Sequence, residues 1–140
     1  MGSCSFSRSA IKKQLGLALL LVAANGSALA DWVPVIRSEV ATYYVDQATI
    51  RRAGDRVQLW ELVDYKKAKA GGNGKPYLSI KLQTEYACRE EQYRILFFSS
   101  SSGNMGRGDV VSSKYFTSEW QPTLAGNVAE AMRKFGCAKR

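Results

Sequence analysis

The side chains that could carry catalysis are few and scattered in this chain of 140 residues. It contains no histidine, which excludes Ser-His-Asp and Cys-His nucleophilic sites, a histidine general base and histidine-ligated zinc. Its 12 carboxylates include no pair whose spacing makes an acid and a base. Glu61 and Asp64, for example, point to opposite faces if they share a strand. We therefore expect no enzyme activity, no metal site and no cofactor. Hydrolysis by two carboxylates that meet only in the folded chain is the weakest alternative.

Basic residues gather in two places and offer binding chemistry instead. Arginines surround a Gly-Asp pair, and lysines line a Gly-rich loop expected at residues 66–76; the candidates are Arg51, Arg52, Arg56, Lys66, Lys67, Lys69 and Lys75. Such a patch suits an anionic glycan, lipopolysaccharide or an acidic protein surface. The alternative is that charged loop tips merely keep the protein soluble. Nucleic acid is not an expected partner, because the basic runs lack regularly interleaved aromatic residues.

The first 30 residues have the pattern of a secretory signal peptide. Arg8, Lys12 and Lys13 precede an apolar stretch of 10 residues, 15–24, and Ala28-Leu29-Ala30 fits a cleavage site. That stretch is too short to span a membrane, which takes about 20 residues. Cys4 lies before the apolar stretch, so no lipid-anchoring cysteine follows it. We expect an exported protein that resides in the periplasm, on the outer surface or outside the cell.

Removing this leader changes both the charge and the cysteine count. It takes away three basic residues and no acid, so the net charge falls from +8 to +5. It also removes Cys4 and leaves Cys88 and Cys137 in an oxidising setting. With two cysteines there is one possible connectivity, and we expect a Cys88–Cys137 disulfide.

Most of the remaining chain, residues 31–140, alternates polar and apolar residues with period two, as strands do. Strands are expected at residues 32–36, 40–45, 48–52, 56–64, 77–88, 93–99 and 109–116. Gly54-Asp55 suits a type II′ hairpin turn, and residues 99–108 are expected to form a Ser/Gly-rich surface loop. The segment 77–88 predicts an antiparallel sheet with one solvated face, which carries Ser79, Lys81, Gln83 and Glu85. Tryptophans and tyrosines could form a binding face, but packing within strands is the preferred interpretation.

The C-terminal segment changes to a helical period. Val128, Met132 and Phe135 recur as an apolar stripe, and Asn127 with Glu130 predicts a capping box. Gly136 fits a left-handed position just past the helix. The predicted fold is therefore α+β: a single antiparallel β-sheet of five or six strands with one C-terminal α-helix, tied by one disulfide.

An ordered set of short motifs resembles the surface-adhesin protein E domain family of Gram-negative bacteria. The resemblance covers about residues 32–137 and rests on 44–46 (YVD), 50–51 (IR), 54–57 (GDRV), 59–65 (LWELVDY), 85–88 (EYAC), 93–94 (YR), 103–106 (GNMG), 119–122 (EWQP) and Cys137. It implies an antiparallel sheet with a helix tied by the disulfide, and a non-enzymatic surface protein. The family's named adhesin binds host matrix and plasma proteins, so the resemblance also implies host matrix proteins as partners. The lipid anchor expected of that adhesin has no matching cysteine here.

The sequence thus predicts an exported binding module that contacts a protein or an anionic glycan through loops and strand edges. The alternative is a periplasmic inhibitor or envelope-stress factor that acts on an enzyme or the cell wall. No transmembrane segment is expected in the mature chain, and a homodimer formed through an open sheet edge is plausible.

Overall fold

The structure is a computed structural model that describes residue 2 and residues 29–138. The predicted signal peptide, 1–30, therefore lies outside the described residues apart from residues 2, 29 and 30. Its cleavage stays a prediction.

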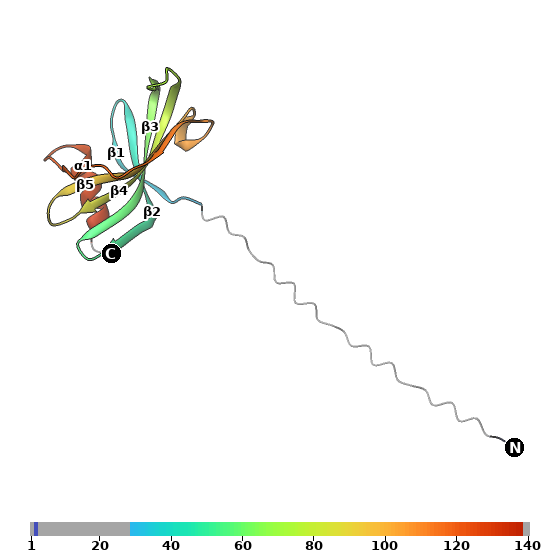
Figure 1. Cartoon of the computed structure of the whole chain (residues 1–140), viewed down its shortest axis with the longest axis horizontal. Coiled ribbons are helices and arrows are strands. Elements are labelled where there is room, and N and C mark those ends of the chain that lie inside the picture. Colours follow the sequence, from blue (N-terminus) through green and yellow to red (C-terminus); the bar gives the residue numbers. More distant parts are fainter. Residues whose placement is uncertain (1, 3–28, 139–140) are drawn as a thin grey trace.

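The predicted fold class is confirmed: one antiparallel sheet is followed by one C-terminal helix (Figure 1). Six strands lie in chain order across the sheet: β1 (Trp32–Arg37), β2 (Ala41–Ala53), β3 (Arg56–Ala70), β4 (Pro76–Ala87), β5 (Gln92–Ser101) and β6 (Val110–Tyr115). A two-residue strand, β7 (Gln121–Pro122), also pairs with β5, and helix α1 (Val128–Cys137) follows. Each neighbour pairing is antiparallel, so the sheet is a meander that needs no long crossover.

The core forms where α1 covers one face of the sheet. Alternation along β3 points Val57 and Leu59 to this face, where they meet Val45, Tyr86 and Met132 in a buried cluster. Val128 and Phe135 of the predicted helical stripe pack against the same cluster. Half of the predicted capping box is present: Asn127 caps the helix, since its Oδ1 accepts from the Glu130 amide at 2.9 Å. Glu130 Oε2 accepts at 2.9 Å from the Gly126 amide and not from that of Asn127, which donates to the Leu124 carbonyl.

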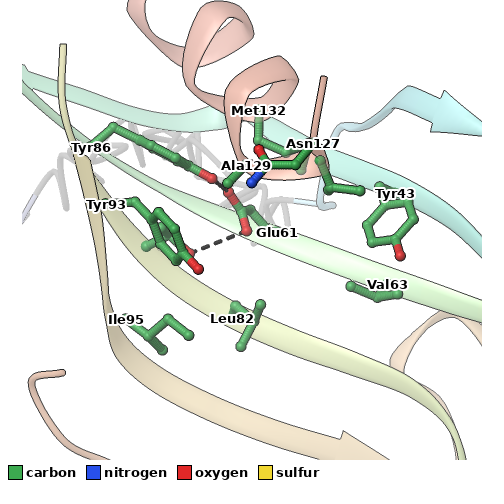
Figure 2. A pocket seen from close by; sticks show the side chains of 12 residues that line it. Tyr43, Glu61, Val63, Leu82, Tyr86, Tyr93, Ile95, Asn127, Ala129 and Met132 are labelled. Atoms are coloured by element: carbon green, nitrogen blue, oxygen red, sulfur yellow. Dashed lines mark hydrogen bonds between the residues drawn. The ribbon is translucent and has the colours of Figure 1, made fainter. Parts of the chain in front are cut away.

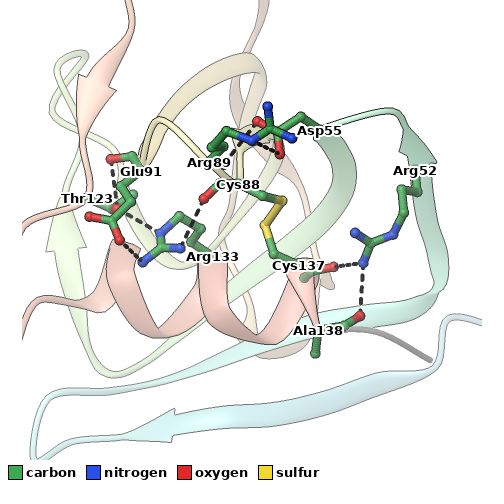
Figure 3. The surroundings of a disulfide bond; sticks show 10 residues. Arg52, Asp55, Cys88, Arg89, Glu91, Thr123, Arg133, Cys137 and Ala138 are labelled. Carbon is green, nitrogen blue, oxygen red and sulfur yellow. Dashed lines mark hydrogen bonds and ion pairs between the residues drawn. A yellow bond between two sulfur atoms is a disulfide. The ribbon is translucent and has the colours of Figure 1, made fainter.

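The predicted disulfide joins Cys88, just after β4, to Cys137, the last residue of α1, with the two Cα atoms 5.8 Å apart (Figure 3). The Arg133 side chain lies nearby and donates to Thr123 Oγ1 at 3.0 Å and to the Cys88 carbonyl at 3.4 Å. The end of the helix is therefore fixed to the sheet by a covalent bond and by hydrogen bonds.

Several local expectations were wrong. The strands expected at 40–45 and 48–52 form one strand, β2, which begins at Ala41 and whose register shifts between Asp46 and Arg51. Ser79, expected on a solvated face of β4, is fully buried under the segment that contains the 3₁₀ turn η1 (Asn104–Gly106). The predicted surface loops are also shorter than expected, because β3 runs to Ala70 and β5 runs to Ser101.

Gly136 does not occupy a left-handed position after the helix but lies inside α1. A Cβ atom at this position would lie 2.6 Å from Leu59 Cδ2. The glycine is therefore explained by the close approach of α1 to β3, and not by a turn. Gly54 does take a positive φ of 59°, as its hairpin turn requires.

Candidate functional site

The lysine cluster lies on the hairpin formed by the end of β3 and the start of β4, which projects beyond the helix-covered part of the sheet (Figure 1). Its four members are exposed: Lys66, Lys67, Lys69 and Lys75. Three of them line a surface depression of about 280 Å³ together with Glu39 and Val40. Within residues 29–138, none of the four lysines has a carboxylate within ion-pair distance. These ammonium groups are therefore available to an anionic partner.

The arginine cluster lies at the other end of β3 and serves the fold. Arg52 donates to the carbonyls of Gly136 and Ala138, at 3.4 and 2.9 Å, and so holds the end of α1 (Figure 3). Arg56 pairs with Glu85 at 3.5 Å and stacks over Trp120. Arg51 donates to the nearby Ala48 and Ile50 carbonyls. The two basic clusters therefore do not form one patch. The arginines are engaged in contacts within the fold, whereas the lysines are available to a partner.

The face of the sheet opposite α1 carries a row of aromatic residues. Cross-strand pairing places Trp32, Trp60, Phe97 and Tyr115 in one line across the sheet, with Asp46 and Gln83 between them. The rings of Trp60 and Phe97 lie 5.3 Å apart, and those of Phe97 and Tyr115 lie 4.5 Å apart. Most of these aromatics pack against each other, as expected, but Tyr115 is 79% exposed.

A cavity of about 370 Å³ lies between α1 and the sheet (Figure 2). Its walls are largely apolar or aromatic, and the residues that line it are Tyr43, Glu61, Val63, Leu82, Thr84, Tyr86, Tyr93, Ile95, Asn127, Val128, Ala129 and Met132. Tyr43, Tyr93 and Ala129 are half-buried and Asn127 is exposed, so the cavity opens to solvent. Its size falls within the range of pockets that bind small molecules.

Glu61 is the one charged residue among those that line this cavity, and only 6% of it is exposed. Tyr86 Oη donates a short hydrogen bond to Glu61 Oε1, and Thr84 Oγ1 donates to Oε2 at 3.2 Å. Burial raises the pKa of Glu61 from 4.5 to about 7, and these two hydrogen bonds oppose the rise. The carboxyl therefore changes its charge near neutral pH. Burial, with the Glu61 charge, also raises the pKa of Tyr86 well above its ordinary value, so Tyr86 stays a hydrogen-bond donor.

From the sequence, Glu61 was not expected to form a site, and it was considered only with Asp64 as two carboxylates on opposite faces of a strand. A signal was present, because Val57, Leu59, Glu61 and Val63 alternate onto one face of β3, and Glu61 is the polar exception. The period-two pattern alone places this glutamate toward the core. Among the described residues, Glu61 is the one carboxylate that lines the cavity.

In residues 2 and 29–138, no helix is long and apolar enough to cross a membrane. Comparison with curated protein sequences finds no significant match.

Among the solved structures that share this fold are three of protein E of Haemophilus influenzae. One is 12% identical, covers 76% of this chain and 83% of its own, and has a TM-score of 0.59. A second crystal form is 12% identical and has a TM-score of 0.62, and the match covers 76% of this chain and 86% of that one. The protein from a non-typeable strain is 13% identical and has a TM-score of 0.58, and the match covers 76% of this chain and 74% of that one. At these identities the likeness shows the fold alone.

The model of the family described as surface-adhesin protein E matches residues 32–138, which include every strand and the helix. This match agrees with the ordered motifs of the sequence and with the sheet, helix and disulfide of the structure. The chain belongs to the surface-adhesin protein E family.

Proposed function

We propose that this chain is an exported, non-enzymatic binding module that holds an anionic glycan or an acidic protein surface through its lysine cluster. The observation that carries the proposal is the group of four exposed lysines on a projecting hairpin, without ion-pair partners among residues 29–138. Membership of an adhesin family favours binding over catalysis. Host matrix proteins, which carry acidic surfaces and glycans, are the proposed partners if the module is displayed on the cell.

The lysines suit an anionic partner for two physical reasons. Their ammonium groups are hydrated point charges on flexible stems, so they can follow an irregular array of sulfates or carboxylates. Lys69 Nζ also lies 5.4 Å from the Tyr65 ring centre, which gives the cluster an aromatic neighbour. Attraction between exposed charges is screened by salt, so retention is expected to fall steeply with ionic strength.

The test is the elution of residues 31–140 from immobilised heparin, with a matrix protein as a second support. The variant K66E/K67E/K69E should elute at clearly lower salt than the unaltered protein. The control R89E/R107E/K114E makes the same change in net charge at exposed positions outside both clusters. The proposal is wrong if the lysine variant elutes with the unaltered protein, or if the control shifts as far.

Cell fractionation separates this function from its alternative. Surface exposure of the chain supports adhesion. Strict periplasmic residence would favour the inhibitor or envelope-stress role and would remove host proteins as partners.

A further inference from the structure

The cavity between α1 and the sheet combines one buried carboxylate with an apolar, aromatic enclosure, and the proposed lysine function leaves it unused. Glu61 accepts one hydrogen bond at each oxygen, from Tyr86 and Thr84. An ionised carboxylate offers about four acceptor positions, so about two remain for a ligand. Figure 2 shows Glu61 in the middle of the lining side chains, beneath Ala129 and Met132.

We propose that this cavity binds a primary ammonium group carried on a short apolar stem, with the ammonium at Glu61 and the stem against Val63, Leu82 and Ile95. The site is independent of the lysine cluster. Its occupant is defined by chemistry: either a free alkylamine or the lysine side chain of a partner protein would present the same group.

Charge complementarity selects a cation over other ligands. Leaving an ionised carboxylate unpaired in an apolar cavity is costly, and a bound ammonium offsets that cost by pairing with it. Tyr43, Tyr86 and Tyr93 supply aromatic walls, whose ring faces also attract cations. Among residues 29–138, no lysine or arginine lines the cavity to compete with the ligand for Glu61. An alkyl stem fits the remaining wall, since that wall is aliphatic.

The proposal implies a defined pH dependence. The groups that face Glu61 are Tyr43 from β2, Thr84 and Tyr86 from β4, Tyr93 from β5, Asn127 just before α1, and Met132 from α1. None of these carries a charge near neutral pH, so Glu61 alone sets the charge of the cavity. Because the pKa of Glu61 is about 7 without ligand, an ammonium ligand binds with proton release below pH 7. Its affinity should rise about tenfold between pH 6 and pH 8, since an alkylammonium stays protonated over that range.

The experiment titrates residues 31–140 with n-hexylamine, n-hexanol and hexanoate, followed by amide NMR shifts of Val128 and Ala129 and by calorimetry. Hexylamine should bind more tightly than hexanol, and E61Q should weaken hexylamine at least tenfold while leaving hexanol unchanged. E90Q, at an exposed glutamate, is the matched control and should leave both affinities unaltered. A129L, which fills the rim of the cavity, should weaken both ligands. Nα-acetyl-lysine methylamide tests whether the ligand is the lysine side chain of a partner protein. If it binds more tightly than hexylamine, the ligand is a partner's lysine; if it binds more weakly, the ligand is a free amine.

The proposal is overturned if hexylamine and hexanol bind equally, or if E61Q binds hexylamine as the unaltered protein does. It is also overturned if hexanoate binds most tightly, because the cavity would then select anions at the start of α1. Heparin retention of E61Q should stay unchanged, so failure here leaves the lysine proposal intact.

Discussion

Glu61 is held on the apolar face of β3 at a cost to folding stability. Its carboxyl is almost fully buried, and the two hydrogen bonds it accepts offset only part of the lost hydration, since its pKa is still raised. A buried carboxyl that is costly to ionise is explained if a ligand binds it in the cavity and offsets that cost. The same residue therefore links stability, pH and the proposed ammonium site.

E61Q should remove a pH dependence from the stability of the protein. The unfolded chain loses the Glu61 proton near pH 4.5, whereas the folded chain keeps it up to about pH 7. The Glu61 contribution to stability is therefore fully present below pH 4.5 and falls as the pH rises to 7, by about 3 kcal/mol for this difference in pKa. In E61Q this fall should be absent. Urea unfolding at pH 5 and pH 8 measures the difference.

E90Q serves as the control, because Glu90 is exposed. Its unfolding free energy should change with pH as that of the unaltered protein does. If E61Q and the unaltered protein lose the same stability between pH 5 and pH 8, the assigned rise in the Glu61 pKa is wrong.

At the scale of elements, Ser79 attaches the segment around η1 to the outer face of the sheet. Its hydroxyl is fully buried, donates to the Gly103 carbonyl at 2.6 Å and accepts from the Gly106 amide at 2.9 Å. Asp64 adds a second attachment, since its Oδ1 accepts from the Met105 amide at 2.7 Å. Two neighbouring strands thus order a Ser/Gly-rich segment that has little core of its own.

S79A should lower the free energy of unfolding by about 1–3 kcal/mol, because it removes two hydrogen bonds of about 0.5–1.5 kcal/mol each, one to the carbonyl of half-buried Gly103 and one from the amide of half-buried Gly106. Hydrogen exchange of the Gly106 amide should also become faster, and this readout separates loosening of the segment from a general loss of stability. S113A, at an exposed position of β6, should alter neither quantity. Unchanged Gly106 exchange in S79A would show that other contacts hold the segment.

The sequence predicts the elements well wherever local pattern decides them. Alternation identifies the strands, and the Asn127 cap and the apolar stripe identify α1. The errors arise where distant segments meet: Ser79 looks solvated until the η1 segment covers it, and Gly136 looks like a helix terminator until Leu59 packs against it. The cavity was missed for the same reason, since its walls come from β2, β3, β4, β5 and α1. By contrast, the exposed lysines needed no tertiary knowledge to be recognised as binding candidates.

At the scale of the whole molecule, the two proposed sites lie in regions that are stabilised by different contacts. The ammonium site depends on α1, which is short and relies on the sheet for its stability. The disulfide, Arg52 and Arg133 hold the last turns of that helix (Figure 3). The lysine cluster lies beyond the helix-covered region, where Lys69 pairs with Tyr77 of β4 and the Lys66 amide donates to the Val40 carbonyl at 3.0 Å. Loosening α1 should therefore affect one site and spare the other.

C88S/C137S tests this separation. The bridge spans 49 positions of the sequence, so its removal should lower the free energy of unfolding by about 4 kcal/mol on the chain-entropy model. In native buffer, hexylamine affinity should fall as the end of α1 loosens, whereas heparin retention should stay that of the unaltered protein. Urea unfolding, amine titration and heparin elution measure the three quantities. Equal loss of both binding activities would show that the hairpin depends on the helix after all, because the fold then responds to the disulfide as one unit.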